Sequence, residues 1–508
     1  MIIDNNKRIA KNTMFLYFRM IITMIVSIYT SRLVLNALGI VDFGISNVVG
    51  GVVMMFSFLN QSMAAATQRF LSFEIGRNNT ERLKKVFSTS VLIHIAIAII
   101  IFVLSETIGL WFLNTKMNID HDRIVATNWV FQCSVISFMV TIMNVPFYAL
   151  IIAHEKIKTF AYVSLLEILL KLLIVFLLVF SDYDKLIFYS IMSLIVTIVI
   201  RITYFIYCKF NFNECNLKFI WDKRLFKNMA SFSGWDLIGS GAFVAKEQGV
   251  NIVINIFCGV AVNASRGIAY QVKSAVQGFV SNFQTAINPQ ITKSFASGDI
   301  SYMVDLITQG ARFSYYILFI ISLPVLIETN TILSLWLNLV PNYAVIFVRL
   351  VLISSLIDSL TGTFSMAMLA TGQIKNYQIV VGGLQFTNLP ISYILLKNGF
   401  PPQTTMIVAI ITSLLSIYFY IWFLKRRINF NGRVFFNKVL MNVFFVSICG
   451  AILPIFMFHY LNDGISRMFI ISIMSILSVM LSIYFIGLSS HERALVKIKI
   501  HEVTKKIF

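Results

Sequence analysis

Charged residues are scarce in this chain. Only 12% of its 508 residues are Asp, Glu, Lys or Arg, whereas 58% are hydrophobic. Soluble globular domains carry about twice that charged fraction, so the composition excludes an ordinary water-soluble protein. What the sequence contains instead is a series of apolar runs, each long enough to cross a bilayer. We therefore expect an all-α polytopic membrane protein.

The sequence also lacks the patterns that hold metals, disulfides or catalytic groups. Its five cysteines show no CxxC or metal-type spacing, and we interpret them as packing residues. The connections between apolar runs are too short to hold a soluble catalytic domain. We expect no cofactor and no metal, and we expect that the chain is not an enzyme.

Acidic residues are fewer than basic ones, which gives a formal net charge of +19. The basic residues fall in short clusters between apolar runs, so they do not form the solvated basic face that nucleic-acid binding requires. Alternate connections carry nearly all of them, with a bias of roughly five to one when the two tails are included. This positive-inside pattern predicts that both termini and the basic loops lie in the cytoplasm.

The apolar runs predict fourteen transmembrane helices and three regions. A weak internal repeat at a spacing of about 220 residues matches Leu33-Val34-Leu35-Asn36 with Ile252-Val253-Ile254-Asn255. Halves so related share one orientation, with a site expected between them. We therefore expect an N-terminal lobe at 1–220, a C-terminal lobe at 221–430, and two extra helices with a basic tail at 431–508. The predicted spans are 13–36, 43–66, 86–113, 124–152, 159–181, 185–208, 227–257, 262–287, 307–330, 342–370, 376–396, 403–424, 437–460 and 466–488.

Ionisable residues within these spans are the candidate functional residues, because a charge at a helix centre costs about 2.5 to 3.5 kcal/mol on insertion scales. At roughly 100° per residue, Arg266, Lys273 and Gln277 share one polar stripe. Such stripes face protein or water, which predicts a hydrated cavity. The cavity cations are Arg19, Arg32, Arg266 and Lys273, the polar residues are Asn47, Gln61 and Gln277, and the acids are Asp236, Glu247 and Asp358.

Simpler interpretations of these charges stand beside the functional one. Arg19 and Arg32 lie close enough to helix ends for their side chains to reach the interface by snorkelling. The three acids are either ion-coupling carboxylates or salt-bridge partners of the cations, and the sequence leaves both open.

The order of several short motifs resembles the polysaccharide flippases of the Wzx type. That family lies in the superfamily that also holds the MATE drug exporters and the lipid II flippases. The predicted span 43–66 departs from the lipid II flippase pattern, because it has no arginine between Phe43 and Ala66. The matching residues are Arg32-Leu33 through Leu38-Gly39, Asp42-Phe43-Gly44, Gly234-Trp235, Gly267-Ile268-Ala269, Asn288-Pro289 and Ala296-Ser297-Gly298-Asp299.

The resemblance implies two six-helix lobes in a V arrangement that alternate between inward and outward openings. It implies a bacterial inner-membrane flippase that moves an undecaprenyl-diphosphate-linked oligosaccharide, such as an O-antigen or capsular repeat unit, to the periplasmic leaflet. Expected partners are this substrate, membrane lipids, and a polysaccharide polymerase or ligase in the same membrane. Two alternatives remain, a MATE-like ion-coupled drug exporter and an integral-membrane enzyme of envelope assembly.

Overall fold

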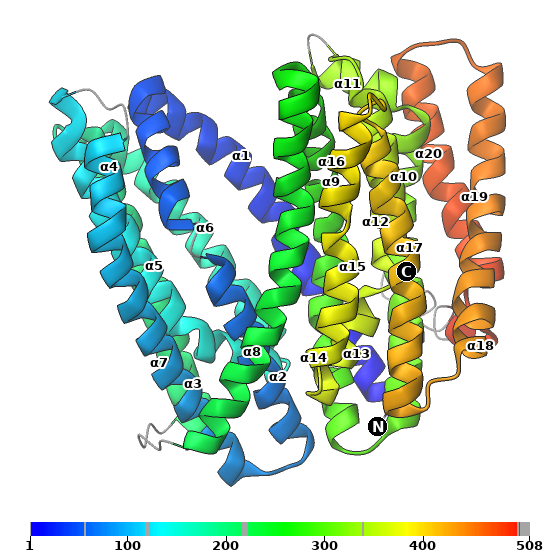
Figure 1. The fold of residues 1–508 in the computed structure, drawn as a ribbon, viewed down its shortest axis with the longest axis horizontal. Coiled ribbons are helices and arrows are strands. Elements are labelled where there is room, and N and C mark those ends of the chain that lie inside the picture. Colours follow the sequence, from blue (N-terminus) through cyan, green and yellow to red (C-terminus); the bar gives the residue numbers. More distant parts are fainter. Residues whose placement is uncertain are drawn as a thin grey trace, which may run out of the picture. The chain divides into compact units, whose positions relative to one another are not determined.

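The structure is a computed structural model, which describes residues 2–54, 57–116, 121–215, 222–337, 340–494 and 497. Within these ranges the regular secondary structure is helical throughout, with no strand (Figure 1). The expected all-α membrane fold is therefore confirmed. The helices are distributed over two compact units.

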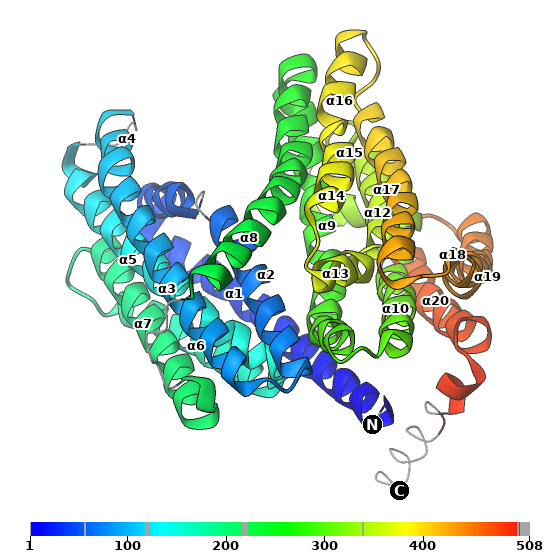
Figure 2. The ribbon, with the colours of Figure 1, turned by 60° about the horizontal axis from the view of Figure 1, so that its bottom comes forward.

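The first unit contains Met1–Ser240, Thr285–Asp299 and Gly372–Lys375. Its core lies between α3, α5, α6 and α7, where the ring of Phe147 meets Phe87 and Phe205 edge-on, each at 5.3 Å between ring centroids. These helices run side by side in both ribbon views (Figure 1 and Figure 2). The helices are α1 (Ile2–Met54), α2 (Ser57–Gly76), α3 (Thr80–Leu104), α4 (Leu110–Lys116), α5 (Ile124–Ala153), α6 (Ile157–Val179), α7 (Lys185–Asn211) and the first part of α8 (Lys223–Val244).

The second unit contains Gly241–Gln284, Ile300–Thr371 and Asn376–Phe508. Its core joins α9, α10 and α12 through buried residues that include Val280, Leu318 and Phe347. The paired helices α19 and α20 pack on α10. The helices are α9 (Val250–Ala296, whose last residues belong to the first unit), α10 (Ile300–Ile327), α11 (Thr329–Trp336), α12 (Ala344–Ser359), α13 (Gly362–Thr371), α14 (Lys375–Tyr377), α15 (Gly383–Phe386), α16 (Asn388–Lys397), α17 (Thr404–Ile428), α18 (Gly432–Phe435), α19 (Met441–Tyr460) and α20 (Ile465–Ser482).

Side chains set several of the helix starts. Asp184 accepts hydrogen bonds from the backbone N–H groups of Leu186 and Ile187, and Asn79 accepts one from Arg82. These caps satisfy donors that the first turn of a helix leaves without a backbone partner.

Eleven helices of the described part of the chain are long and apolar enough to cross a membrane. They correspond to eleven of the fourteen predicted spans. The other three predictions, 43–66, 227–257 and 262–287, fall on α1 with α2, on α8 with α9, and on α9. These are the segments with polar stripes, whose amide and charged side chains lower the hydropathy of any window.

The backbone repeats itself at a spacing of 220 residues. Both α1 and α9 are long helices interrupted by one glycine with positive φ, namely Gly39 (φ 79°, ψ 173°) and Gly259 (φ 80°, ψ 177°). The turns after α2 and α9 use Asn78 (φ 54°) and Gly298 (φ 81°) at the same spacing. A residue with a Cβ rarely adopts these conformations, so the coincidence is a strong signature. It supports the internal repeat, while the lobe boundaries stay a prediction.

Candidate functional site

An ion pair forms the centre of a polar cluster in the second unit. Glu247 lies in the π-helical turn Ala245–Gly249 that joins α8 to α9. Lys273 comes from the middle of α9, and its Nζ is 2.5 Å from Glu247 Oε1. Both side chains are about four-fifths buried, so the pair is largely removed from solvent but still reachable from it. We call the polar group around this pair the cation cluster.

Arg266 adds a second cation, two helical turns before Lys273 on α9. It is only 4% exposed, and it donates to Asn251 Oδ1 (3.1 Å) and to the Glu247 backbone carbonyl (2.8 Å). Its guanidinium lies 4.0 Å from the centroid of the Tyr270 ring, and Lys273 Nζ lies 5.0 Å from the same centroid. The aromatic face thus stabilises both cations without neutralising either.

Lys246 is the third cation of the cluster. Its Nζ donates to Gln385 Oε1 at 2.7 Å, and Gln385 in turn donates to Ser416 Oγ at 2.7 Å. The side chain is buried, and its hydrogen-bond partner is a neutral amide. Asp358, near the end of α12, is close enough to interact electrostatically with both Lys246 and Lys273.

The cation cluster carries an excess of positive charge. Among the described residues it holds Lys246, Arg266 and Lys273 against the carboxylates of Glu247 and Asp358. An unbalanced buried charge is unfavourable, and it is tolerated where a ligand or water completes the balance. Arg offers a planar fork that fits phosphate oxygens, and Lys offers a compact charge. The arrangement is therefore suited to an anionic ligand such as a phosphate.

The structure brings together four of the predicted site residues, namely Arg266, Lys273, Glu247 and Asp358, and Gln277 follows Lys273 by one turn of α9. Arg19 lies in the first unit, where its guanidinium is 4.7 Å from the Phe160 ring centroid. Asp236 is buried in α8 and also belongs to the first unit. The side chains of Arg32, Asn47 and Gln61 lie outside the described residues.

Lys246 was absent from the predicted site for a geometric reason. In a regular α-helix adjacent residues point about 100° apart, which separates Lys246 from the face of Glu247. In the structure Lys246 bonds to Gln385 of α15, whereas Glu247 bonds to Lys273 of α9. The local helix is π-helical, and such turns are frequent at functional sites. The intramembrane position of Lys246 was the only signal in the sequence.

A second polar network lies in the first unit and was not predicted. Glu155, between α5 and α6, has a side chain that is only 1% exposed and a left-handed backbone (φ 59°). Its carboxylate is 2.7 Å from Arg8 Nε, and it accepts hydrogen bonds from Lys293 and, at 2.7 Å to each oxygen, from Gln290. Asn12 donates to its backbone carbonyl. We call these five residues the carboxylate cluster, and its carboxylate is fully satisfied.

Comparison with known proteins identifies the fold. No protein-family model and no curated protein sequence matches the chain. Solved structures do match it, among them an outward-facing multidrug resistance MATE family transporter of the MOP superfamily (11% identity, TM-score 0.71, 84% of this chain and 96% of that chain). A MOP superfamily transporter from Pyrococcus furiosus gives 10% identity and a TM-score of 0.70 with the same coverage.

The MATE transporter ClbM in complex with Rb+ also matches, with 15% identity and a TM-score of 0.67, and with 84% of this chain and 96% of that chain covered. These identities are low, so the likeness concerns the fold. Together with the eleven apolar helices it describes a multi-pass membrane protein. The chain therefore has the fold of MATE family transporters.

Proposed function

We propose that the protein is a flippase that translocates an undecaprenyl-diphosphate-linked oligosaccharide from the cytoplasmic to the periplasmic leaflet by alternating access. The observation that carries this proposal is the excess of buried cations around Tyr270 and Glu247. A diphosphate supplies the negative charge that the cluster lacks. Arg266 would grip phosphate oxygens through its fork, while Lys246 and Lys273 would add attraction without fixed geometry.

The grip must also be reversible, because a transporter has to release its cargo. Lys273 is already held by Glu247 at 2.5 Å, so a phosphate that binds Lys273 has to displace this carboxylate. The displaced carboxylate repels the phosphate and competes for Lys273 again, which favours release. The Pyrococcus furiosus transporter is likewise described as having a binding pocket of reversed polarity that suggests a different function for that protein.

The experiment that tests this proposal is deletion of the gene in its host, followed by analysis of lipid-linked glycans. We expect repeat units to accumulate on the cytoplasmic leaflet while their synthesis continues, and complementation should reverse the accumulation. Loss of synthesis would instead indicate an enzyme. Unaltered glycan export would contradict the flippase proposal.

A MATE-like ion-coupled exporter is the second candidate. It is favoured by the carboxylates Glu247 and Asp358, which lie beside the cations and could accept a proton or a cationic drug. Drug susceptibility of the deletion strain separates the two candidates. New sensitivity to cationic drugs with normal glycan export would support the exporter, whereas glycan accumulation with unchanged susceptibility would support the flippase.

The location and topology of the proposal are testable independently of cargo. We propose that the chain lies in the bacterial inner membrane with both termini in the cytoplasm, since basic residues gather in alternate connections. Reporter fusions after Lys438 and at the carboxyl end should both report a cytoplasmic position. A periplasmic signal from either fusion would contradict the count of fourteen spans.

A further inference from the structure

A polar cavity of about 380 Å³ lies in the second unit, between α10, the start of α19 and the segment that follows α20. Its charged lining residues are Asp305 and Arg312 from α10, Lys438 from the π-helical turn Phe436–Leu440, and Glu492 after α20. Ile486 and Leu488 give one wall an apolar surface. The cavity shares no residue with the cation cluster.

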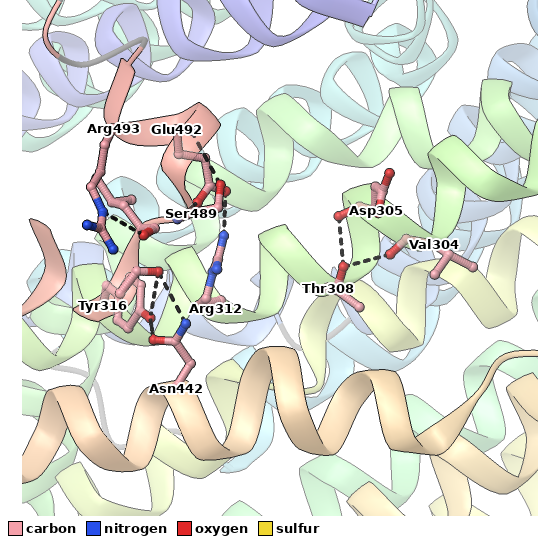
Figure 3. A network of polar contacts seen from close by, with 11 residues as sticks. Val304, Asp305, Thr308, Arg312, Tyr316, Asn442, Ser489, Glu492 and Arg493 are labelled. Carbon is pink, nitrogen blue, oxygen red and sulfur yellow. Dashed lines mark hydrogen bonds and ion pairs between the residues drawn. The ribbon is translucent and has the colours of Figure 1, made fainter. Parts of the chain in front are cut away.

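A network of hydrogen bonds adjoins this cavity, as Figure 3 shows. Tyr316 is buried and donates to Asn442 Oδ1 at 2.8 Å, while Asn442 donates to the Gly487 carbonyl at 3.4 Å. The Tyr316 hydroxyl would lie only 3.0 Å from a Cβ at position 487, so a side chain there would crowd the Tyr316 ring. The hydrogen bonds tie α10, α19 and the π-helical turn Ile483–Gly487 together.

Arg312 is the buried cation of the cavity, with 7% of its surface exposed. One of its terminal nitrogens donates to Glu492, whose other oxygen accepts the backbone N–H of Ser489 at 2.7 Å (Figure 3). Its Nε is buried and has no hydrogen-bond acceptor among the described residues. A buried guanidinium donor without an acceptor is unfavourable, so an anionic ligand that reached this part of Arg312 would remove that cost.

Three membrane-spanning helices have an end near the cavity. It is near the start of the apolar helices Ile300–Ile327 and Gly432–Tyr460 and at the end of Ile465–Gly487. The adjoining stretch from Lys425 to Lys438 contains five basic residues and no acidic one. Helix ends of this kind meet lipid headgroups, and basic residues there attract anionic ones. The basic stretch adjoins the cavity, whose own lining has two cations and two carboxylates.

We infer that this cavity binds the phosphate-bearing headgroup of an anionic phospholipid. The phosphate contacts Lys438 and Arg312, and the apolar wall of Ile486 and Leu488 receives the start of the lipid chains. Glu492 competes with the phosphate for Arg312. When no lipid is bound, the Glu492 carboxylate takes the place of the phosphate beside Arg312. This inference does not depend on the cargo that the protein transports.

The test measures lipid binding to the purified full-length protein in neutral detergent, by thermal shift against short-chain phosphatidylglycerol, phosphatidylcholine or inorganic phosphate. Phosphatidylglycerol should stabilise the protein, and the other two should not at equal concentration. Lys438→Gln should weaken the apparent affinity about tenfold, the size expected for one charge-assisted hydrogen bond. Equal stabilisation by inorganic phosphate, or by phosphatidylcholine, would overturn the lipid assignment.

The decisive variant is Glu492→Gln, which removes the competing acid. If Arg312 awaits a phosphate, this variant should bind phosphatidylglycerol several-fold more tightly than the unchanged protein. If the Arg312–Glu492 pair is only structural, the variant should lower the melting temperature without a gain in affinity, which would refute the inference.

Arg433→Gln is the matched control, because it removes one charge from the same basic stretch outside the cavity lining. It should bind phosphatidylglycerol like the unchanged protein. An equal loss in Arg433→Gln and Lys438→Gln would show diffuse attraction to the basic surface, and would also overturn the inference.

Discussion

The two polar clusters of this protein differ in how fully their charged groups are bonded and in how much of each side chain stays exposed. In the carboxylate cluster a single acid, Glu155, is surrounded by Arg8, Lys293 and Gln290, and its side chain is 1% exposed. The cation cluster holds three cations, Lys246, Arg266 and Lys273, and two carboxylates, and the side chains of Lys273 and Glu247 keep 19% and 24% of their surface exposed.

The difference indicates which cluster is structural and which is available to a ligand. A carboxylate whose oxygens both accept hydrogen bonds has no position left for a ligand, so the carboxylate cluster stabilises the fold. Cations bonded to a neutral amide, a carbonyl or an aromatic face keep most of their charge for another partner. This contrast predicts that substitutions in the carboxylate cluster lower stability, whereas those in the cation cluster lower transport.

The largest effect is expected for Glu155→Ala. Removing the acid leaves Arg8 and Lys293 without their buried counter-charge, and breaking a buried ion pair in this way costs about 3 to 5 kcal/mol. We expect a strongly reduced melting temperature in detergent and low protein abundance in the membrane. A variant with unchanged melting temperature would show that the carboxylate cluster is dispensable for folding.

Arg266→Gln should have the next largest effect, and on transport. The substitution keeps hydrogen-bonding capacity but removes the charge, so glycan export should fall about ten- to a hundredfold at normal protein abundance. Arg266→Lys should retain part of the activity, because the charge persists without the bidentate fork. Export at the unaltered rate in Arg266→Gln would remove this residue from the proposed site.

Exchanging the partners of the central ion pair separates charge balance from ligand binding. The single variants Lys273→Glu and Glu247→Lys each break the ion pair and should lower the melting temperature. The double variant re-forms the pair with the charges exchanged, so its melting temperature should be closer to that of the unchanged protein. Export should stay at least about tenfold low, because the cation has moved away from Tyr270. Full export by the exchanged pair would favour a structural role for Lys273.

The smallest effect is expected for Lys171→Gln in α6. Lys171 pairs with Glu167 one turn earlier at 2.7 Å, and its side chain is half exposed. On a helix face that water reaches, a pair of this spacing contributes about 0.3 to 0.5 kcal/mol, so on a hydrated face both melting temperature and export should remain close to their usual values. A large loss of either would mean that Glu167 and Lys171 belong to a site outside both clusters.

The fold was predictable because bilayer insertion leaves a strong signal in the sequence. Apolar length predicted the helices. The stripe of Arg266 and Lys273 was also accessible, since α9 is regular between them.

The rest of the site depends on features that a sequence pattern does not carry. Lys246 lies in a π-helical turn and bonds to Gln385, which is 139 residues away in the sequence. Glu155 meets Gln290 and Lys293 across more than 130 residues, and its left-handed backbone has no sequence signal when the residue is not glycine. Contacts of that kind follow from tertiary packing, not from local pattern.

The repeated kinks at Gly39 and Gly259 let each position of one half be matched with a position in the other by a constant offset. The residues that match Lys246, Glu247, Arg266 and Lys273 in the first half are Val26, Ser27, Ser46 and Val53, all uncharged. The stretch at 25–29 is also ordinary α-helix, whereas its counterpart Ala245–Gly249 is π-helical. The same backbone arrangement thus forms with and without the charged residues. Neither the cations nor the π-helical turn is needed for it to form. If the halves arose by duplication, the charged residues belong to only one of two copies of the same backbone.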